Sequence, residues 1–274
     1  MQSLPFTIPT PQKVEYINLL LKAGFDTVEV GSMASPKFVP QMADTLEVLK
    51  KLDLSARKSK VMVLVLNLKG AEAVAGLDEV DVISYPYSIS PQFLKKNMNV
   101  TPEKSLEDIR SIRELCVKNK KEMVIYISMA FGNPYGDEWN LNLLITETEK
   151  LVKAGATVIP LSNVSMLIDE TRIREVFPEV IREFPDTEIG LHLHTDGKIL
   201  EPVIDAACSI GIRRFDTVFH GIGGCPMTDG KMLGNVDTAY LVHHVEKLKI
   251  HTGIDKHILN SAGIMARNIF RLDS

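Results

Sequence analysis

Short runs of apolar and β-branched residues alternate along this chain with longer segments of helical period. The apolar runs, which predict strands, lie near residues 26–30, 60–66, 79–84, 122–128, 156–161, 187–193 and 213–219. The helical pattern recurs in segments 102–118, 140–153, 168–183, 198–210 and 237–248. Such regular alternation predicts a parallel sheet whose strands are joined by right-handed crossovers.

The chain opens with a helix, since Thr10 is a suitable N-cap, Pro11 fits the first helical position, and the apolar period continues to Gly24. Seven strands and a length of 274 residues predict an α/β fold of the TIM (β/α)8 barrel type that lacks its first strand. We expect one domain over residues 1–274, helices from about residue 237 included. The alternative is a doubly wound open sheet, but no Gly-rich phosphate fingerprint follows a strand.

Composition argues against several classes of function. The net charge of -4 comes from interspersed acids and bases, which disfavours a nucleic-acid partner. The three cysteines are an odd number without scaffold spacing, which favours a reducing, cytoplasmic location. No apolar run is long enough to span a bilayer, and the N-terminus lacks the pattern of a signal peptide. We therefore expect a soluble protein without a membrane partner.

Two histidines one residue apart, His192 and His194, close the predicted strand near 187–193. Residues i and i+2 of a strand share a face, so both rings can hold one divalent cation. The alternative is a pair of ordinary strand histidines. A second signal lies further on, where the glycine-hinged segment 221–226 carries Cys225 and is followed by Asn235.

The chemistry of a barrel sits where strands end and loops begin. Polar residues at these positions are Glu29, Asn67, Ser162, Asn163, His192, His194 and His220.

Each of these candidates has a structural alternative. Glu29 could be a solvent-facing strand residue, and Asn67 could simply cap a helix. Cys225 could be a buried small hydrophobe, although its flanking glycines favour an accessible thiol. Cys116 and Cys208 lie in helical patterns and are expected to serve packing.

The sequence resembles the 3-hydroxy-3-methylglutaryl-CoA lyases of the DRE-TIM metallolyase superfamily. The Ser-Pro-Lys-x-Val-Pro-Gln-Met segment at 35–42 and the Gly-x-Gly-Gly-Cys-Pro segment at 221–226 are specific to these lyases, whereas His-x-His is shared with related synthases and aldolases. The resemblance runs nearly end to end. Its further matching stretches are 28–29, 32–34, 67–70, 95–97, 132–135, 234–235 and 250–253.

By this resemblance the chain is expected to cleave an acyl-CoA substrate to acetoacetate and acetyl-CoA with Mg²⁺ or Mn²⁺. It implies His192, His194 and Asn235 as metal ligands. It also implies that Glu29 organises the site, that His192 accepts or relays a proton and that Cys225 is the catalytic thiol. A homodimer is the expected assembly. The residues expected to bind substrate are Asn67, Lys69, Lys95, Lys96 and Asn163.

Three departures from the family pattern qualify this expectation. The family has an Arg-Asp pair at the end of its first strand, and this chain starts just beyond it, so we expect a truncated and impaired form. Asn163 and Val164 stand where an acidic residue and Thr are usual, and the loop from Cys225 to Asn235 is one residue longer. Two alternatives follow: a related metallolyase acting on another 3-hydroxyacyl-CoA, or a non-catalytic acyl-CoA-binding relative.

Overall fold

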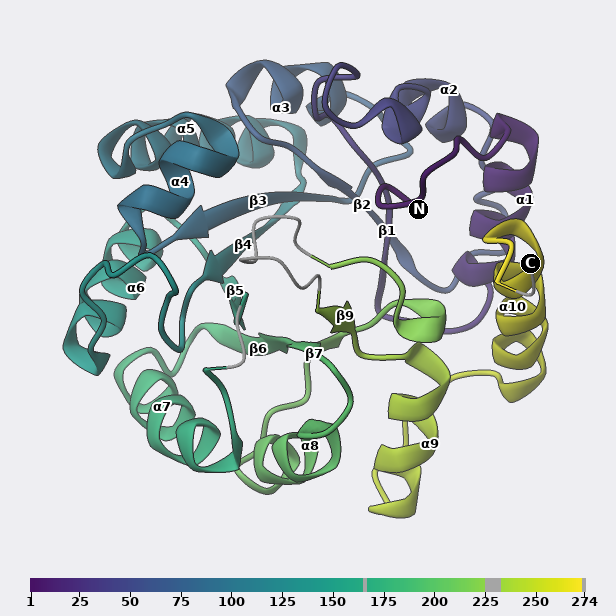
Figure 1. The fold of residues 1–274 in the computed structure, drawn as a ribbon. Helices are drawn as coiled ribbons and strands as arrows, with labels where there is room; N and C mark the ends of the chain where they lie inside the picture. The colour runs from purple at the N-terminus through teal and green to yellow at the C-terminus, as the bar shows by residue number, and fades with distance from the viewer. Residues whose placement is uncertain (165–166, 225–232, 273–274) are drawn as a thin grey trace.

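A curled parallel sheet forms the centre of the protein, and helices surround it (Figure 1). The computed structural model describes residues 1–164, 167–224 and 233–272. In this part of the chain the order of the seven strands is β1-β2-β3-β4-β5-β6-β8, with β1 and β8 at the edges. The predicted barrel fold with one strand fewer than eight is thus confirmed. The strands are β1 (Thr27–Ser32), β2 (Lys60–Leu64), β3 (Val82–Ser88), β4 (Glu122–Ser128), β5 (Val158–Ser162), β6 (Glu188–His192) and β8 (Phe215–Asp216).

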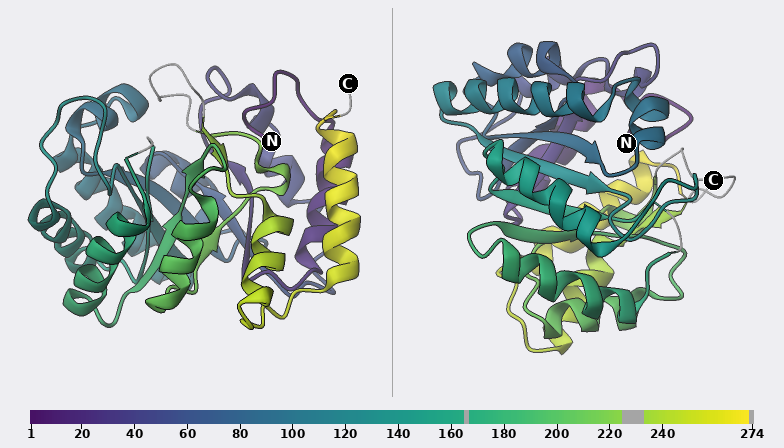
Figure 2. Two further views of the ribbon diagram at one scale, coloured as in Figure 1. Left: turned by 60° about the horizontal axis from the view of Figure 1, so that its bottom comes forward. Right: turned by 90° about the vertical axis from the view of Figure 1, so that its left-hand side faces the viewer.

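The helices lie on the outer, convex side of the sheet, as the two views in Figure 2 show. No helix within the described ranges is long and apolar enough to cross a membrane. The helices are α1 (Thr10–Leu21), α2 (Thr45–Leu49), α3 (Leu68–Ala75), α4 (Pro91–Met98), α5 (Pro102–Asn119), α6 (Leu141–Lys153), α7 (Glu170–Glu183), α8 (Leu200–Ser209), α9 (Thr238–Lys247) and α10 (Lys256–Ile269), with short 3-10 turns η1 (Pro40–Met42) and η2 (Phe219–Gly221).

Side chains alternate between the two faces of each strand, and this separates the core from the interior of the curl. On β3, Tyr85 and Tyr87 point outward into the helices and are fully buried. The Tyr85 hydroxyl lies 3.0 Å from the Ser105 hydroxyl of α5, and Tyr87 donates a 2.6 Å hydrogen bond to Glu147 of α6. Ser84, the residue before Tyr85, therefore faces the interior.

The lower interior of the curl is apolar. Met62, Val82 and Val124 pack together there as a small buried cluster of their own, separate from the main core between sheet and helices. These residues lie in the first half or the middle of β2, β3 and β4. The inward positions nearer the carboxyl ends of the strands are therefore left to other, polar side chains.

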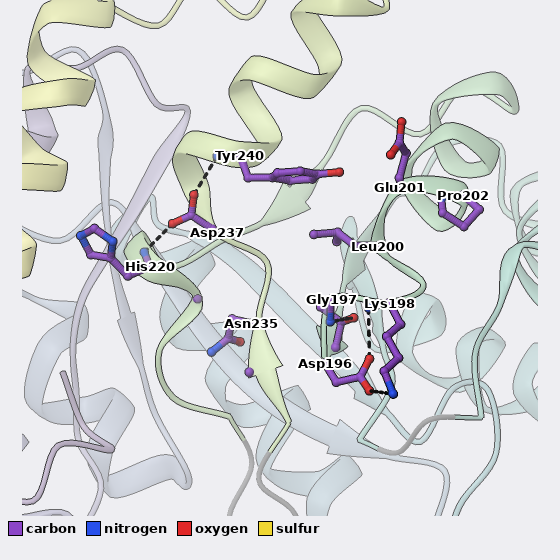
Figure 3. Close-up of a pocket in the computed structure, with 13 residues that line it drawn as sticks. Asp196, Gly197, Lys198, Leu200, Glu201, Pro202, His220, Asn235, Asp237 and Tyr240 are labelled. Carbon is purple, nitrogen blue, oxygen red and sulfur yellow. Dashed lines mark hydrogen bonds and ion pairs between the residues drawn. The ribbon is translucent and has the colours of Figure 1, made fainter. Parts of the chain in front are cut away.

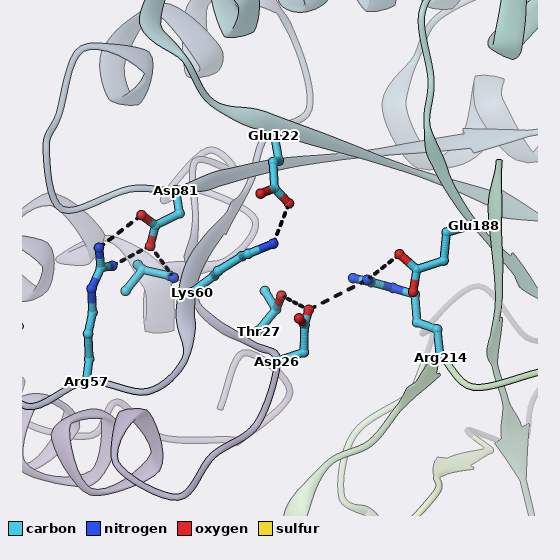
Figure 4. A network of polar contacts seen from close by, with 9 residues as sticks. Asp26, Thr27, Arg57, Lys60, Asp81, Glu122, Glu188 and Arg214 are labelled. Atoms are coloured by element: carbon cyan, nitrogen blue, oxygen red, sulfur yellow. Dashed lines mark hydrogen bonds and ion pairs between the residues drawn. The ribbon is translucent and has the colours of Figure 1, made fainter. Parts of the chain in front are cut away.

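Charged side chains lie at the amino ends of the strands, at the end of the curl opposite to the carboxyl ends (Figure 4). Lys60 of β2 bonds to Glu122 of β4 at 2.8 Å. Arg214 lies 3.6 Å from Glu188 and 3.9 Å from Asp26, which precedes β1. Arg214 directly precedes β8, and Asp26 directly precedes β1. The ion pair between them therefore links the two edge strands of the sheet, between which no backbone hydrogen bonds are described.

The structure differs from the predicted elements at several points. The third strand is β3 (Val82–Ser88) and not 79–84, and the predicted strand at 213–219 is limited to Phe215–Asp216 because η2 begins at Phe219. The segments predicted to be helical do not include α2, α3 or α4, whereas α10 is covered only by the general expectation of helices from about residue 237. Helices α2, α3 and α4 have eight residues or fewer, which is too short for a clear helical period.

The first and last helices lie side by side, α1 in purple and α10 in yellow (Figure 1). They enclose a second apolar cluster in which the Tyr16 ring meets Phe270 edge-on at 5.8 Å between centroids. Phe219 of η2 inserts into this cluster, 6.4 Å from both Tyr16 and Phe25. The terminal helices therefore hold the segment that leads into the glycine-rich loop.

Replacing Phe219 with alanine should lower the free energy of unfolding by about 3 to 5 kcal/mol, because Phe219 is 5% exposed and its removal leaves a cavity among aromatic rings. Urea unfolding measures this change, provided that the slope of the unfolding free energy against urea concentration is the same in both proteins. Val117→Ala is the control, since Val117 is 61% exposed and should give almost no change. Equal effects of the two substitutions would contradict the proposed packing role.

Candidate active site

The two histidines lie at the carboxyl end of β6, but not on one strand. His192 ends β6, and His194 begins β7 (His194–Thr195), a short strand that pairs antiparallel with β9 (Gly234–Asn235). The two rings nevertheless approach to 4.9 Å between centroids and stand nearly perpendicular. The chain thus brings both imidazoles together across the break at Leu193.

His192 is held by a carboxylate. Its Nδ1 lies 3.0 Å from Oδ2 of Asp216, its direct neighbour on β8 in the sheet register. When Nδ1 donates to this carboxylate, the proton is fixed on Nδ1 and Nε2 keeps its lone pair for a metal or a proton. Sequence reasoning missed Asp216, although an acidic residue inside the apolar run 213–219 was a usable signal.

Tyr126 of β4 completes the surroundings of His192. Its ring meets the imidazole edge-on, with 5.4 Å between centroids. Burial first, and then the charge of Asp216, raise the pKa of Tyr126 well above its usual value, so its hydroxyl stays protonated. The tyrosine can therefore act only as a neutral donor beside the Asp216 carboxylate.

His194 offers an unused ring nitrogen. The residue is buried, and among the described residues its Nδ1 has no hydrogen-bond partner. Burial, and secondarily His192, lower the pKa of His194 to about 3, against an opposing backbone hydrogen bond with Gly234. The ring is therefore neutral near pH 7. A buried, neutral imidazole nitrogen without a partner suits a divalent cation, so the residues fit such a group.

Asn235 is the direct partner of His194 in the β7–β9 ribbon. Its side-chain nitrogen donates a 2.9 Å hydrogen bond to the carbonyl of Ile222, so the amide oxygen is the atom suited to a cation. Gly221 makes this approach feasible: its φ is 62°, and a Cβ there would lie 2.7 Å from the Asn235 carbonyl oxygen. The ribbon and the start of the glycine-rich loop are thus closely packed.

Glu29 lies on β1 beside an irregularity in the β1–β2 register, between Glu29 and Gly31. Such bulges re-aim the neighbouring side chain. Thr45 braces the bulge, since its hydroxyl accepts a 3.2 Å hydrogen bond from the amide of Ser32. A Cβ at Gly31 would lie 2.6 Å from the Thr45 methyl group, so glycine is needed here.

The Glu29 carboxyl is reachable by solvent but lies among protein groups inside the curl. Ser84 donates a 3.3 Å hydrogen bond to its Oε2. Loss of hydration, followed by the charge of Asp216, raises the pKa of Glu29 to about 7, while His192 and Ser84 oppose this shift. Glu29 can consequently give or take a proton near neutral pH.

The four other residues predicted to bind substrate lie on the βα loops and helices beyond β2 and β3. Asn67 caps α3 by accepting a 2.9 Å hydrogen bond from the amide of Gly70, as its structural alternative expected. Lys69 on α3 and Lys95 on α4 are exposed. Lys96 is exposed as well, and its ammonium group stands 4.1 Å from the centre of the Tyr135 ring.

Asn163 differs from these residues because it is 1% exposed. Its amide oxygen accepts a 2.8 Å hydrogen bond from the backbone N–H of His194, and its amide nitrogen donates a 2.7 Å bond to the carbonyl of the same residue. The side chain therefore touches the histidine pair through the backbone.

Two of the three cysteines have the packing role that the sequence predicts. Cys116 and Cys208 are buried on α5 and α8, and burial raises the pKa of the Cys116 thiol to about 11, which fits a packing role. Cys225 lies outside the described residues, so its role in catalysis stays a prediction.

A groove of about 600 Å³ lies between α8 and α9 beside the ribbon (Figure 3). It shares Asn235 with the site, but neither His192 nor His194 is among its described lining residues. Glu201, one of its lining residues, belongs to a group with Asp205 and the buried His244, in which His244 is bonded to Asp205 at 2.7 Å. His192, His194 and Asn235, which meet at the carboxyl end of the sheet, are therefore the stronger candidate for a metal site.

Comparison with known proteins agrees with this geometry. The family model described as HMGL-like matches residues 1–265. The chain belongs to the HMGL-like family. Hydroxymethylglutaryl-CoA lyase, mitochondrial, from Gallus gallus is 31% identical over 98% of this chain and 89% of its own length.

Solved structures of the same family superimpose on nearly the whole chain. An HMG-CoA lyase from Brucella melitensis has a TM-score of 0.90 at 29% identity and covers 98% of this chain and 94% of its own. An HMG-CoA lyase from Acinetobacter baumannii, solved in complex with coenzyme A and 3-methylmalate, has a TM-score of 0.89 at 26% identity, with 98% and 87% covered.

The raised pKa of Glu29 predicts a pH-dependent effect of Glu29→Gln. Between the usual pKa of 4.5 and the folded value of about 7, the folded protein binds more protons than the unfolded chain. The stabilisation by the protonated carboxyl is therefore lost as the pH rises through this window. Glu29→Gln lacks this loss, so its stability relative to wild type should rise from pH 4.5 to 7 and then level off.

Urea unfolding of both proteins between pH 4.5 and 8 measures this difference. Glu72→Gln, at an exposed position on α3, is the matched control and should show no comparable trend. A stability difference for Glu29→Gln that is flat across this range would rule out a raised pKa.

Proposed function

We propose that this chain is a metal-dependent carbon-carbon lyase that cleaves 3-hydroxy-3-methylglutaryl-CoA to acetoacetate and acetyl-CoA. The observation that carries the proposal is the meeting of His192, His194 and Asn235 at the mouth of the curled sheet, in a chain of the HMGL-like family. Relatives of this family carry the name of that activity.

We assign His192, His194 and Asn235 as the residues that would hold Mg²⁺ or Mn²⁺. The partnerless Nδ1 of the neutral His194 supports this assignment. A bound cation would polarise the tertiary hydroxyl and the neighbouring carboxylate of the substrate.

Proton transfer is assigned to groups inside the curl. His192 is the proposed acceptor or relay for the hydroxyl proton, and Asp216 would stabilise its charged form through the 3.0 Å contact. A cation on Nε2 of His192 would occupy the lone pair needed for this role. In that case Glu29, whose pKa of about 7 suits a general base, takes the proton.

Bond cleavage then follows from loss of that proton. The oxygen forms the ketone of acetoacetate, the carbon–carbon bond breaks, and its electron pair passes to the thioester as the acetyl-CoA enolate. A proton must return to the enolate carbon, and we assign its delivery to Cys225.

Lys69, Lys95 and Lys96, with Asn67, are proposed to meet the anionic acyl-CoA. Their exposure on α3 and α4 supports access by a large ligand, as does the relative solved with coenzyme A. A homodimer in the cytoplasm remains our proposal for assembly and location.

A direct assay tests the function. Purified protein with Mn²⁺ or Mg²⁺ should release acetoacetate and acetyl-CoA from 3-hydroxy-3-methylglutaryl-CoA at the lowered rate expected of an impaired form, and chelation of the metal should abolish both products. Other 3-hydroxyacyl-CoA thioesters form the comparison panel. Faster cleavage of another thioester would favour a related metallolyase, whereas acyl-CoA binding without cleavage of any would favour the non-catalytic alternative.

Cys225→Ser should lower turnover by about 10²- to 10⁴-fold if the thiol transfers a proton. Cys208→Ser is the matched control, because Cys208 is buried on α8 and should change stability more than turnover. Steady-state kinetics and thermal melting separate the two effects. Equal loss of turnover in both variants at equal stability would contradict the assignment.

A further inference from the structure

Asn163 continues the sheet where its backbone ladder stops. The β5–β6 register ends at the pair Ser162 and His192, and β5 itself ends at Ser162. One residue later the side chain of Asn163, and not its backbone, reaches the next strand. Its two amide atoms bond to the N–H and the carbonyl of His194 at 2.8 and 2.7 Å.

We propose that Asn163 is a positioning residue that sets the place of His194, and through it of the β7–β9 ribbon. This inference rests on the proposed function in so far as His194 and Asn235 serve as metal ligands. The ribbon strands have two residues each, so their own ladder is a weak anchor. Because His194 and Asn235 are direct ribbon partners, one side chain orients two of the three proposed ligands.

The chemistry of the contact requires an amide. Asn163 both accepts and donates, whereas an ionised aspartate only accepts hydrogen bonds. In Asn163→Asp one carboxylate oxygen would face the His194 carbonyl oxygen across the present 2.7 Å contact with no hydrogen between them. The carboxylate would repel that carbonyl and shift the backbone that carries the imidazole.

Solvent does not compensate for such a loss. Asn163 is 1% exposed, and the neighbouring Val164 is 2% exposed, so the contact is enclosed. A buried carbonyl without a donor costs free energy comparable to a lost hydrogen bond. Water therefore cannot replace the amide, and the two hydrogen bonds of Asn163 hold the backbone of His194 in place.

The test compares Asn163→Asp with Asn119→Asp in the full-length protein. Asn119 is half-buried at the end of α5, away from the site, and its amide nitrogen donates a 2.8 Å bond to the carbonyl of Leu115. Both substitutions thus place a carboxylate against a backbone carbonyl. Asn163→Asp should weaken Mn²⁺ binding by about 10- to 100-fold, whereas Asn119→Asp should leave it unchanged. Titration followed by the electron paramagnetic resonance of free Mn²⁺ measures both.

A double-mutant cycle shows whether the effect passes through His194. In a His194→Ala background, Asn163→Asp should cause a smaller further loss of Mn²⁺ affinity than in the wild type, because Asn235 is then the one proposed ligand that it still orients. Full additivity of the two losses would overturn the proposal, as would wild-type affinity in Asn163→Asp. If Asn163→Asp does not fold, Asn163→Ala removes the amide without adding a charge and takes its place in the same cycle.

A metal-free readout separates this proposal from the proposed function. The imidazole nitrogen resonances of His194, assigned in 15N-histidine-labelled protein by comparison with His194→Ala, should shift or broaden in Asn163→Asp and stay in place in Asn119→Asp. Failure of the wild type to bind Mn²⁺ together with this shift would reject the metal site but keep the positioning role. Unchanged resonances in Asn163→Asp would reject the positioning role whatever the metal result.

Discussion

The strict alternation of side chains along parallel strands is the constraint on which this structure depends. Outward residues such as Tyr85 and Tyr87 reach the helices, so Ser84, which precedes Tyr85, must face the interior of the curl. By the same rule, His192 and its register partner Asp216 point to the same side. A slip of one residue would send these polar groups into the apolar layer under the helices.

The sequence alone predicted the barrel class and most of its elements, together with the candidate histidines, because those signals are local. Partners across strands were not predictable in this way. The pairing of His192 with Asp216 depends on the register between β6 and β8, and Asn163 reaches His194 only because β5 stops one residue earlier. The β7–β9 ribbon joins residues about forty positions apart and leaves no periodic pattern.

The interior of the curl couples its charges. Asp216 contacts His192, and its charge raises the pKa of Glu29, while Met62, Val82 and Val124 form a separate apolar cluster. A change of charge at Asp216 or His192 therefore changes the pKa of Glu29. This coupling is a reason to regard them as one unit and not as separate catalytic positions.

The aromatic cluster around Phe219 also bears on how this gene can vary. Residues from the two ends of the chain, Tyr16 and Phe270, share one packing site with the residue that leads into the glycine-rich loop. Selection on that loop would therefore act on codons of both α1 and α10, which lie far apart in the sequence. Covariation between α1 and α10 would then be a record of loop function as much as of stability.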